Sequence, residues 1–223
     1  MFTAVSVGRL ERDVRDEISE IFADFDTATE HGASGLRRRQ LYAYYDIFIH
    51  LQDFTGENAA AAARDAVEGP GTARVRERLA RLVPAYGPAG DEDRPTAFYH
   101  WEGEPPVDKE TGLHTTVIVN RVADEVIPEV ARLFGGLDAT GFPHRMGTRR
   151  RQLFAYQGVY FHLQDFPGED GTAVIGQAWR EADPRFVQIC ADLDPLVKKY
   201  APERWRSTAD QIATRFYHWE AAE

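Results

Sequence analysis

Short β-branched runs and longer segments of helical periodicity alternate along the chain, and the series occurs twice. Residues 3–7 and 115–119 are β-branched and short, which predicts a first strand in each half. Apolar residues then recur every three or four positions, a pattern typical of a helix with one apolar stripe. These residues are Val14, Ile18, Ile21, Phe22 and Phe25 in the first half, and Val126, Val130, Leu133, Phe134 and Leu137 in the second.

Residues 37–54 and 149–166 have nearly the same sequence, and each predicts a β-hairpin. Residues 45–46 and the equivalent residues 157–158 suit a two-residue turn. Such a turn fixes which residues of the two strands face each other, because side chains alternate between the two faces of a sheet.

The register gives each hairpin two different faces. Leu41 lies opposite His50 on one of them. In the two copies this face carries Arg39, Phe48, His50 and Gln52, and Arg151, Tyr160, His162 and Gln164. We expect the other, more apolar face to pack on the helices and the His50 face to line a cavity between two sheets. Arg38 and Arg150 lie on the opposite face, and we interpret them as solvated charges.

Each half continues with an Ala-rich helical segment, broken near a proline, and ends in an aromatic strand. The helical segments are residues 58–86 and 172–200, their breaks residues 69–71 and 183–184, and the strands residues 98–102 and 216–220. The resulting β-α-β-β-α-β order is the ferredoxin-like arrangement of the α+β class. Because each repeat leaves one sheet face open, we expect the two to form a pseudo-two-fold dimeric α+β barrel within one chain.

The repetition indicates one domain that was duplicated and fused. We place a first repeat at residues 1–103 and a second at residues 113–223, each long enough for its own apolar core. Residues 104–112 are rich in Pro, Gly and charged residues, which indicates a short linker.

A net charge of −10 argues against nucleic acid and anionic membranes as partners, because both require a basic surface. The single Cys190 excludes an intrachain disulfide, and we interpret it as a small core or helix residue. The first predicted strand leaves no room for a signal segment, and no run reaches the length of a membrane span. We therefore expect a soluble, cytoplasmic protein.

His100 and His218 are also repeated, and they raise the question of a metal site. Such a site needs three or four convergent ligands, and no Cys pair or His-x-x-x-His spacing supports one. No Gly-rich phosphate loop and no Gly-x-Ser-x-Gly sequence is present. We expect neither a metal nor a cofactor.

Three sequence features together resemble the tetracenomycin-type aromatic polyketide cyclases. They are Arg-Arg-Arg-x-Leu-aromatic-x-aromatic, aromatic-x-His-Leu after a short turn, and a later Phe-Tyr-x-Trp, at residues 37–44, 48–51 and 98–101 and in their copies. The resemblance covers nearly all of both halves. It implies a ferredoxin-like enzyme without a cofactor, an aromatic polyketide intermediate as ligand, and polyketide synthase components as further partners. It also implies a pocket between the sheet and the helices of each half.

The resemblance assigns candidate catalytic roles to an Asp after the first helix, the third Arg of the triplet and the strand His. By position these are Asp26, Arg39 and His50 in the first half and Asp138, Arg151 and His162 in the second. Imidazole moves protons near neutral pH, and a guanidinium stabilises an enolate oxygen. Phe48, Gln52, Tyr160 and Gln164 are candidate substrate-binding residues on the same face. The alternatives are a hydrogen-bonded core His, a solvated strand Arg and a helix-capping Asp.

The chain departs from the family pattern in two places, and the second departure distinguishes the halves. The His that precedes the Asp in the family is replaced by Phe25 and Leu137. An Asp-x-Thr sequence is kept at residues 138–140, whereas residues 26–28 read Asp-Thr-Ala. We therefore expect the second half to be the more active.

Three functions stay open. The favoured one is a cyclase that promotes regioselective intramolecular aldol condensation and dehydration of a poly-ketone. The second is a cofactor-independent monooxygenase that oxidises a polyketide phenol to a quinone, and the third is a non-catalytic polyketide-binding protein. A requirement for oxygen would separate the first two. Unchanged products after substitution of His50 and His162 would indicate the third.

Overall fold

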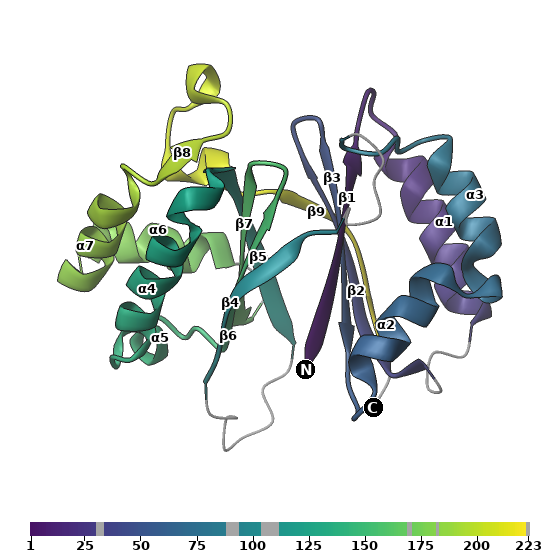
Figure 1. Cartoon of the computed structure of the whole chain (residues 1–223), viewed down its shortest axis with the longest axis horizontal. Helices are drawn as coiled ribbons and strands as arrows, with labels where there is room; N and C mark the ends of the chain where they lie inside the picture. Colours follow the sequence, from purple (N-terminus) through teal and green to yellow (C-terminus); the bar gives the residue numbers. More distant parts are fainter. Residues whose placement is uncertain (30–33, 88–93, 104–111, 169–170, 182, 222–223) are drawn as a thin grey trace. The chain divides into compact units, whose positions relative to one another are not determined.

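The computed structural model describes residues 1–29, 34–87, 94–103, 112–168, 171–181 and 183–221. The predicted linker, residues 104–112, lies outside the described residues except for Gly112. The chain forms two compact units, one of Met1–Arg94 with Thr214–Glu223 and one of Pro95–Ala213. In each unit, helices cover one face of an antiparallel sheet (Figure 1).

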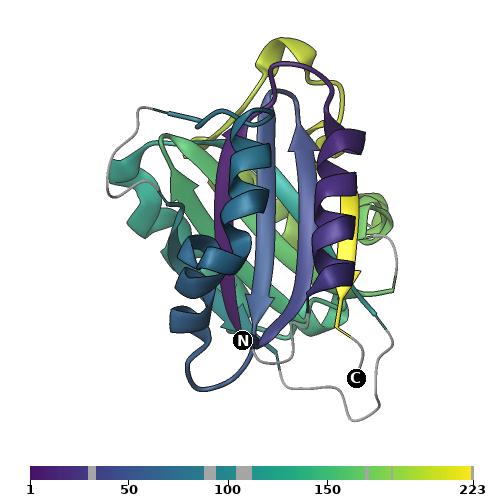
Figure 2. The same cartoon turned by 90° about the vertical axis from the view of Figure 1, so that its right-hand side faces the viewer.

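The first unit contains a four-stranded sheet in the order β1-β3-β2-β9. Its elements are β1 (Phe2–Arg9), α1 (Arg15–Ala28), β2 (Leu36–Tyr44), β3 (Ile47–Phe54), α2 (Ala59–Glu68), η2 (Pro70–Thr72), α3 (Ala73–Ala80) and β9 (Thr214–Glu220). The helices lie in front of the strands in Figure 2. The core forms where Ile18 and Phe22 of the predicted apolar stripe pack on Leu41 and Phe48 of the sheet.

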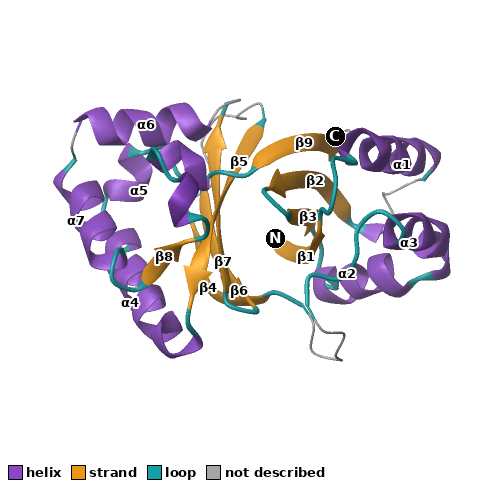
Figure 3. Ribbon diagram, turned by 90° about the horizontal axis from the view of Figure 1, so that it is seen from above, coloured by secondary structure: helices purple, strands orange, loops and turns teal. Residues whose placement is uncertain are grey.

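The second unit contains a five-stranded sheet in the order β4-β6-β7-β5-β8. Its elements are β4 (Thr96–Glu102), β5 (Leu113–Val122), η3 (Asp124–Val126), α4 (Ile127–Asp138), α5 (Phe142–Arg145), β6 (Arg150–Tyr156), β7 (Val159–Pro167), α6 (Gly171–Glu181), α7 (Pro184–Leu193), β8 (Val197–Lys199), η4 (Pro202–Arg204) and η5 (Thr208–Gln211). Helices and sheet form separate layers in Figure 3. At the predicted helix break, Asp183 accepts a hydrogen bond from the Arg185 N–H and starts α7. The α+β class with two ferredoxin-like sheets is confirmed.

The last strand of each repeat joins the sheet of the other unit instead of completing its own half. β4, from the first repeat, pairs with β6, and β9, from the second repeat, pairs with β2. Both strands carry the sequence Phe-Tyr-His-Trp-Glu, so their own residues do not specify which sheet they join. The boundaries at residues 103 and 113 thus describe the sequence repeats, whereas the chain crosses between the compact units after Arg94 and after Ala213.

The predicted hairpin register is confirmed in both copies. Leu41 pairs with His50, and Leu153 pairs with His162. The second turn needs a left-handed backbone at both central residues, and Gln157 and Gly158 have φ values of 48° and 75°.

The predicted assignment of the sheet faces is wrong. Leu41 and Phe48, and with them Arg39 and His50, face the helices, because Leu41 and Phe48 pack against α1. Tyr42 on the other face is also only 1% exposed. Since both faces are largely apolar and buried, the number of apolar residues on a face could not identify the helix side. The cavity that Arg39 and His50 line therefore lies between sheet and helices.

Arg38 and Arg150 are not solvated, contrary to the sequence interpretation. Arg38 is 4% exposed and donates from Nε to Asp53, at 2.8 Å, and Arg150 makes the same contact with Asp165, at 2.9 Å. The hydroxyl of Thr115 donates to that Asp165 carboxylate at 2.6 Å. Both Arg side chains are therefore in buried ion pairs, and the carboxylate that satisfies each of them lies three residues after the strand His.

Arg38→Ala should lower the free energy of unfolding by about 3–5 kcal/mol, because it leaves the Asp53 charge buried without its partner. Arg37→Ala is the matched control: Arg37 is exposed, and the change should stay within about 0.5 kcal/mol. Urea unfolding followed by tryptophan fluorescence measures both. Equal midpoints for the two variants would contradict the ion-pair assignment.

A fragment of residues 95–213 should fold better alone than one of residues 113–223. The first retains the whole sheet of the second unit, whereas the second lacks β4 and leaves the backbone of β6 as an open edge. We expect cooperative unfolding and a dispersed amide NMR spectrum for residues 95–213, and aggregation or dimerisation for residues 113–223. A stable, monomeric 113–223 fragment beside an unfolded 95–213 fragment would contradict the strand exchange.

Candidate functional site

A buried, hydrogen-bonded network lies between the sheet of the second unit and α4. Arg151 donates from Nε to both carboxylate oxygens of Asp138, at 2.9 and 3.2 Å, and from Nη1 to Nε2 of His162, at 2.7 Å. All three side chains are at most 6% exposed. Arg151 and His162 meet because they lie diagonally across the neighbouring strands β6 and β7, and Asp138 reaches them from the end of α4.

The first unit repeats this network. Arg39 donates from Nε to both oxygens of Asp26, each at 3.1 Å, and from Nη1 to Nε2 of His50 at 2.8 Å. The structure thus brings the six predicted catalytic residues together as two sets of three. Their chemical roles stay predictions.

A tyrosine from the exchanged strand completes each network, and sequence reasoning missed it. The Tyr99 hydroxyl donates to Asp138 at 2.9 Å, and the Tyr217 hydroxyl donates to Asp26 at 2.9 Å. Burial is the main cause that raises the pKa of Tyr99, with the Asp138 charge adding to it, so the hydroxyl stays protonated and donates. The repeated Phe-Tyr-His-Trp-Glu sequence was the available signal, but it did not reveal that each Tyr serves the other repeat.

The network holds His162 in its neutral form. A guanidinium only donates, so Nε2 of His162 accepts and the proton sits on Nδ1. Burial, and then the Arg151 charge, lower the pKa of His162 well below its usual value. Burial also raises the pKa of Asp138, and Arg151 opposes that change. The predicted alternative of a hydrogen-bonded core His therefore describes the resting state of this residue.

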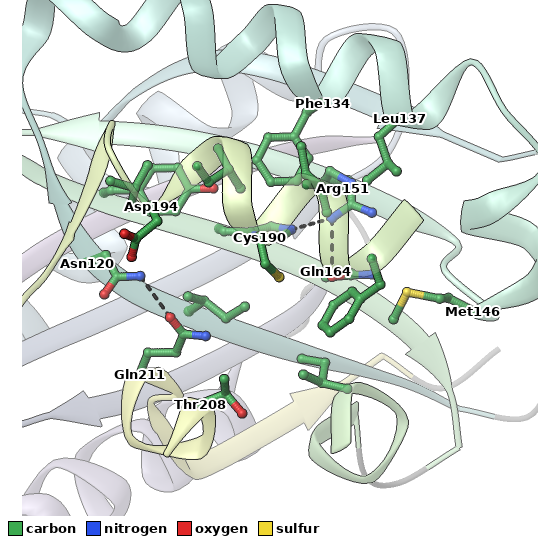
Figure 4. Close-up of a pocket in the computed structure, with 18 of the residues that line it drawn as sticks. Asn120, Phe134, Leu137, Met146, Arg151, Gln164, Cys190, Asp194, Thr208 and Gln211 are labelled. Carbon is green, nitrogen blue, oxygen red and sulfur yellow. Dashed lines mark hydrogen bonds between the residues drawn. The ribbon is translucent and has the colours of Figure 1, made fainter. Parts of the chain in front are cut away.

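A cavity of about 290 Å³ adjoins the network of the second unit. Its walls are mostly apolar side chains of α4, α5, α6 and α7, and its polar wall is the sheet (Figure 4). Arg151 and His162 line it, as do the predicted substrate-binding residues Tyr160 and Gln164. Gln164 accepts from Arg151 at 3.3 Å and donates to Thr148 at 2.6 Å. The pocket position implied by the resemblance, between sheet and helices, is the one that the structure has.

The first unit has a cavity of its own, of about 270 Å³, in the same position between sheet and helices. We call it the first cavity, and we call the cavity of the second unit the second cavity. Arg39 and His50 line it, together with the predicted substrate-binding residues Phe48 and Gln52. Both cavities are near the lower end of the usual range for small-molecule sites.

Cys190 and the repeated histidines lie in different surroundings. Cys190 lies in α7 and lines the second cavity, and burial raises the pKa of its thiol to about 11. His100 and His218 lie within 3.5 and 3.7 Å of Glu102 and Glu220. Within the described ranges, no group of three His, Cys, Asp or Glu side chains is placed to hold a metal ion.

Residues 197–213 add an element that sequence reasoning did not connect with the site. Trp205, Thr208 and Gln211 come from this segment and line the second cavity, and Gln211 accepts a hydrogen bond from Asn120 at 2.9 Å.

No described helix combines the length and the apolar composition needed to span a membrane.

Comparison with known proteins identifies both repeats. The polyketide synthesis cyclase family matches residues 2–102 and 114–220. Polyketide synthase CurG of Streptomyces cyaneus is 33% identical over 111 residues, 48% of this chain and 98% of that protein. Tetracenomycin F2 cyclase of Streptomyces glaucescens is 29% identical over 108 residues, 48% of this chain and 95% of that protein. Each of these relatives has the length of one repeat.

A solved structure is similar over the whole chain. A protein of Lactobacillus acidophilus described as a putative monooxygenase matches with a TM-score of 0.57 over 99% of this chain and 97% of that one. The identity is 9%, so the likeness concerns the fold alone.

Stability should fall as the pH drops below about 7, because the unfolded chain protonates His162 near pH 6.5 while the folded chain does so only at lower pH. In that window the unfolded state binds the extra proton, and each such His contributes a slope of up to about 1.4 kcal/mol per pH unit. His162→Gln keeps an acceptor for Arg151 and should remove the contribution of one proton from the pH dependence of the free energy of unfolding. Urea unfolding between about pH 5 and about pH 8, a range that spans the usual His pKa of about 6.5, measures this slope.

His50→Gln is the matched variant in the first unit, since the pKa of His50 is lowered by the same causes. The double variant should lose both contributions. A wild-type slope in His162→Gln would show that this imidazole is not held neutral.

Proposed function

The chain belongs to the polyketide synthesis cyclase family, and we propose that it promotes regioselective intramolecular aldol condensation and dehydration of a poly-ketone, which produces an aromatic ring. Its ligand is an aromatic polyketide intermediate. Components of a polyketide synthase supply that intermediate, and the protein itself uses no cofactor. The proposed site is the cavity of the second unit.

The observation that carries this proposal is a buried guanidinium with one nitrogen left for a ligand. Within the described chain, Nε and Nη1 of Arg151 donate to Asp138, His162 and Gln164, and no residue accepts from Nη2. Arg151 also lines the cavity, whose surroundings are largely apolar. A fixed positive donor in such surroundings stabilises a negative oxygen much more than water does.

The aldol reaction creates a negative oxygen twice. Removal of a proton from a methylene between two ketones gives an enolate, and its carbon then attacks another carbonyl and makes an alkoxide. Nη2 of Arg151 can donate to either oxygen, and the apolar walls hold the chain in one folded conformation. Loss of water from the product then forms the double bond that leads to the aromatic ring.

His162 is the proposed proton carrier. Its Nε2 lone pair accepts from Nη1 of Arg151 in the resting site, so Nε2 becomes available as a base when that guanidinium N–H turns to the substrate oxygen. The Arg151 charge helps to suppress protonation of His162 in the resting site. An enolate oxygen next to Arg151 compensates that charge, so the basicity of His162 rises as the enolate forms. The imidazolium then gives its proton to the alkoxide, which becomes a hydroxyl. In the dehydration the regenerated imidazole takes the second α-proton and returns it to the departing hydroxyl, which leaves as water.

Arg151→Gln should reduce the yield of cyclised product by about 10²–10³-fold, the usual effect of removing one oxyanion donor. Arg39→Gln is the matched control, because it removes the same buried contacts in the first unit. The assay incubates a minimal polyketide synthase with each purified variant and analyses the products, under air and under nitrogen. Equal losses from both variants would contradict the assignment to the second unit.

The same assay decides between the three functions. A cyclase gives its product under nitrogen, whereas a product that needs air would indicate the monooxygenase. A wild-type protein that binds the intermediate and leaves the product profile unchanged would indicate a binding protein.

A further inference from the structure

Two buried polar atoms in the second cavity have no hydrogen-bond partner among the described residues. They are the Tyr160 hydroxyl and the Oδ1 atom of Asn120. Tyr160 is 2% exposed and Asn120 8%, and both line the cavity. Because buried polar groups are almost always hydrogen-bonded, each orphaned atom in a cavity wall needs an explanation.

The two side chains are neighbours on the sheet face that holds the catalytic network. Asn120 in β5 lies opposite Tyr160 in β7, so both project from the same face. The Tyr160 and His162 rings are 6.3 Å apart between centroids. The Asn120 amide donates from Nδ2 to Gln211 (Figure 4), which leaves Oδ1 as its free acceptor.

The first unit lacks this polar pair at the equivalent position. Gly8 lies opposite Phe48 there, in the places of Asn120 and Tyr160. A Cβ atom on Gly8 would collide with Cγ1 of Val83, so Val83 occupies this corner. The networks of the two units match, and their cavities differ in the polarity of this corner.

We propose that Tyr160 and Asn120 form an oxygen-binding subsite for an enol or phenol hydroxyl of the substrate. The Tyr160 hydroxyl donates a hydrogen bond to the ligand oxygen. Asn120 Oδ1 accepts a hydrogen bond from the ligand, either from the hydroxyl that carries this oxygen or from an adjacent enol hydroxyl of the same 1,3-diketone. Under the proposed function, on which this inference rests, the subsite fixes the position of one oxygen along the poly-ketone. It thereby determines which carbonyl reaches Arg151, and so the regiochemistry of ring closure.

Calorimetric titration of the whole protein with naphthol and with naphthalene tests the subsite without any polyketide. The wild type should prefer naphthol by about tenfold or more, since a good hydrogen bond is worth about that factor. Tyr160→Phe removes only the hydroxyl and should abolish the preference, and Asn120→Ala should reduce it. Tyr42→Phe is the control: the Tyr42 hydroxyl donates to Gln40, outside the cavity, and the preference should persist.

Product analysis with the minimal polyketide synthase gives the second readout, in which Tyr160→Phe should change the ratio of ring isomers. A naphthol preference that survives in Tyr160→Phe would overturn the subsite, whatever the wild-type protein does to polyketides. A preference lost in Tyr160→Phe supports the subsite. If the wild type then alters no polyketide product, the cyclase proposal alone fails.

Discussion

The buried arginines of the two sheets, Arg38, Arg39, Arg150 and Arg151, set the constraint on which the rest of this structure depends. A guanidinium in an apolar interior must be neutralised and hydrogen-bonded, because an unpaired buried charge is strongly destabilising. Arg151 meets that requirement through Asp138 at the end of α4 and through His162 on the next strand. The ion pair therefore holds helix to sheet, keeps the imidazole neutral and leaves one guanidinium nitrogen at the cavity. Stability and candidate chemistry rest on the same contacts.

The strand exchange gives each network a residue from the other repeat. Tyr99 belongs to the first repeat in sequence, yet its hydroxyl donates to Asp138 of the second unit, and Tyr217 does the reverse. Neither network is complete without a residue from the other repeat. Duplication and fusion thus place both contributions in one chain, whereas relatives of single-repeat length match only half of it.

The two units keep the same charged network and differ around it. Arg39 and Arg151 each bind an Asp and a His in the same way, but the corner with Gly8 and Phe48 is apolar where Asn120 and Tyr160 are polar. Such a difference leaves the ion pair intact and changes what the cavity recognises. The expectation, drawn from residues 138–140, that the second half is the more active stays a prediction.

The sequence by itself determined the hairpin register and most of the strands and helices, because periodicity and turn chemistry are local properties. The six residues of the two networks followed from the family resemblance, whereas α5 and β8 were not predicted. It did not determine which sheet face meets the helices, since both faces are apolar, nor that Arg38 is buried, since its partner Asp53 lies on another strand. Only the tertiary structure decided which sheet β4 and β9 join. Backbone hydrogen bonds are the same at every sheet edge, and the Phe-Tyr-His-Trp-Glu sequence that the two strands share does not indicate which edge each strand completes.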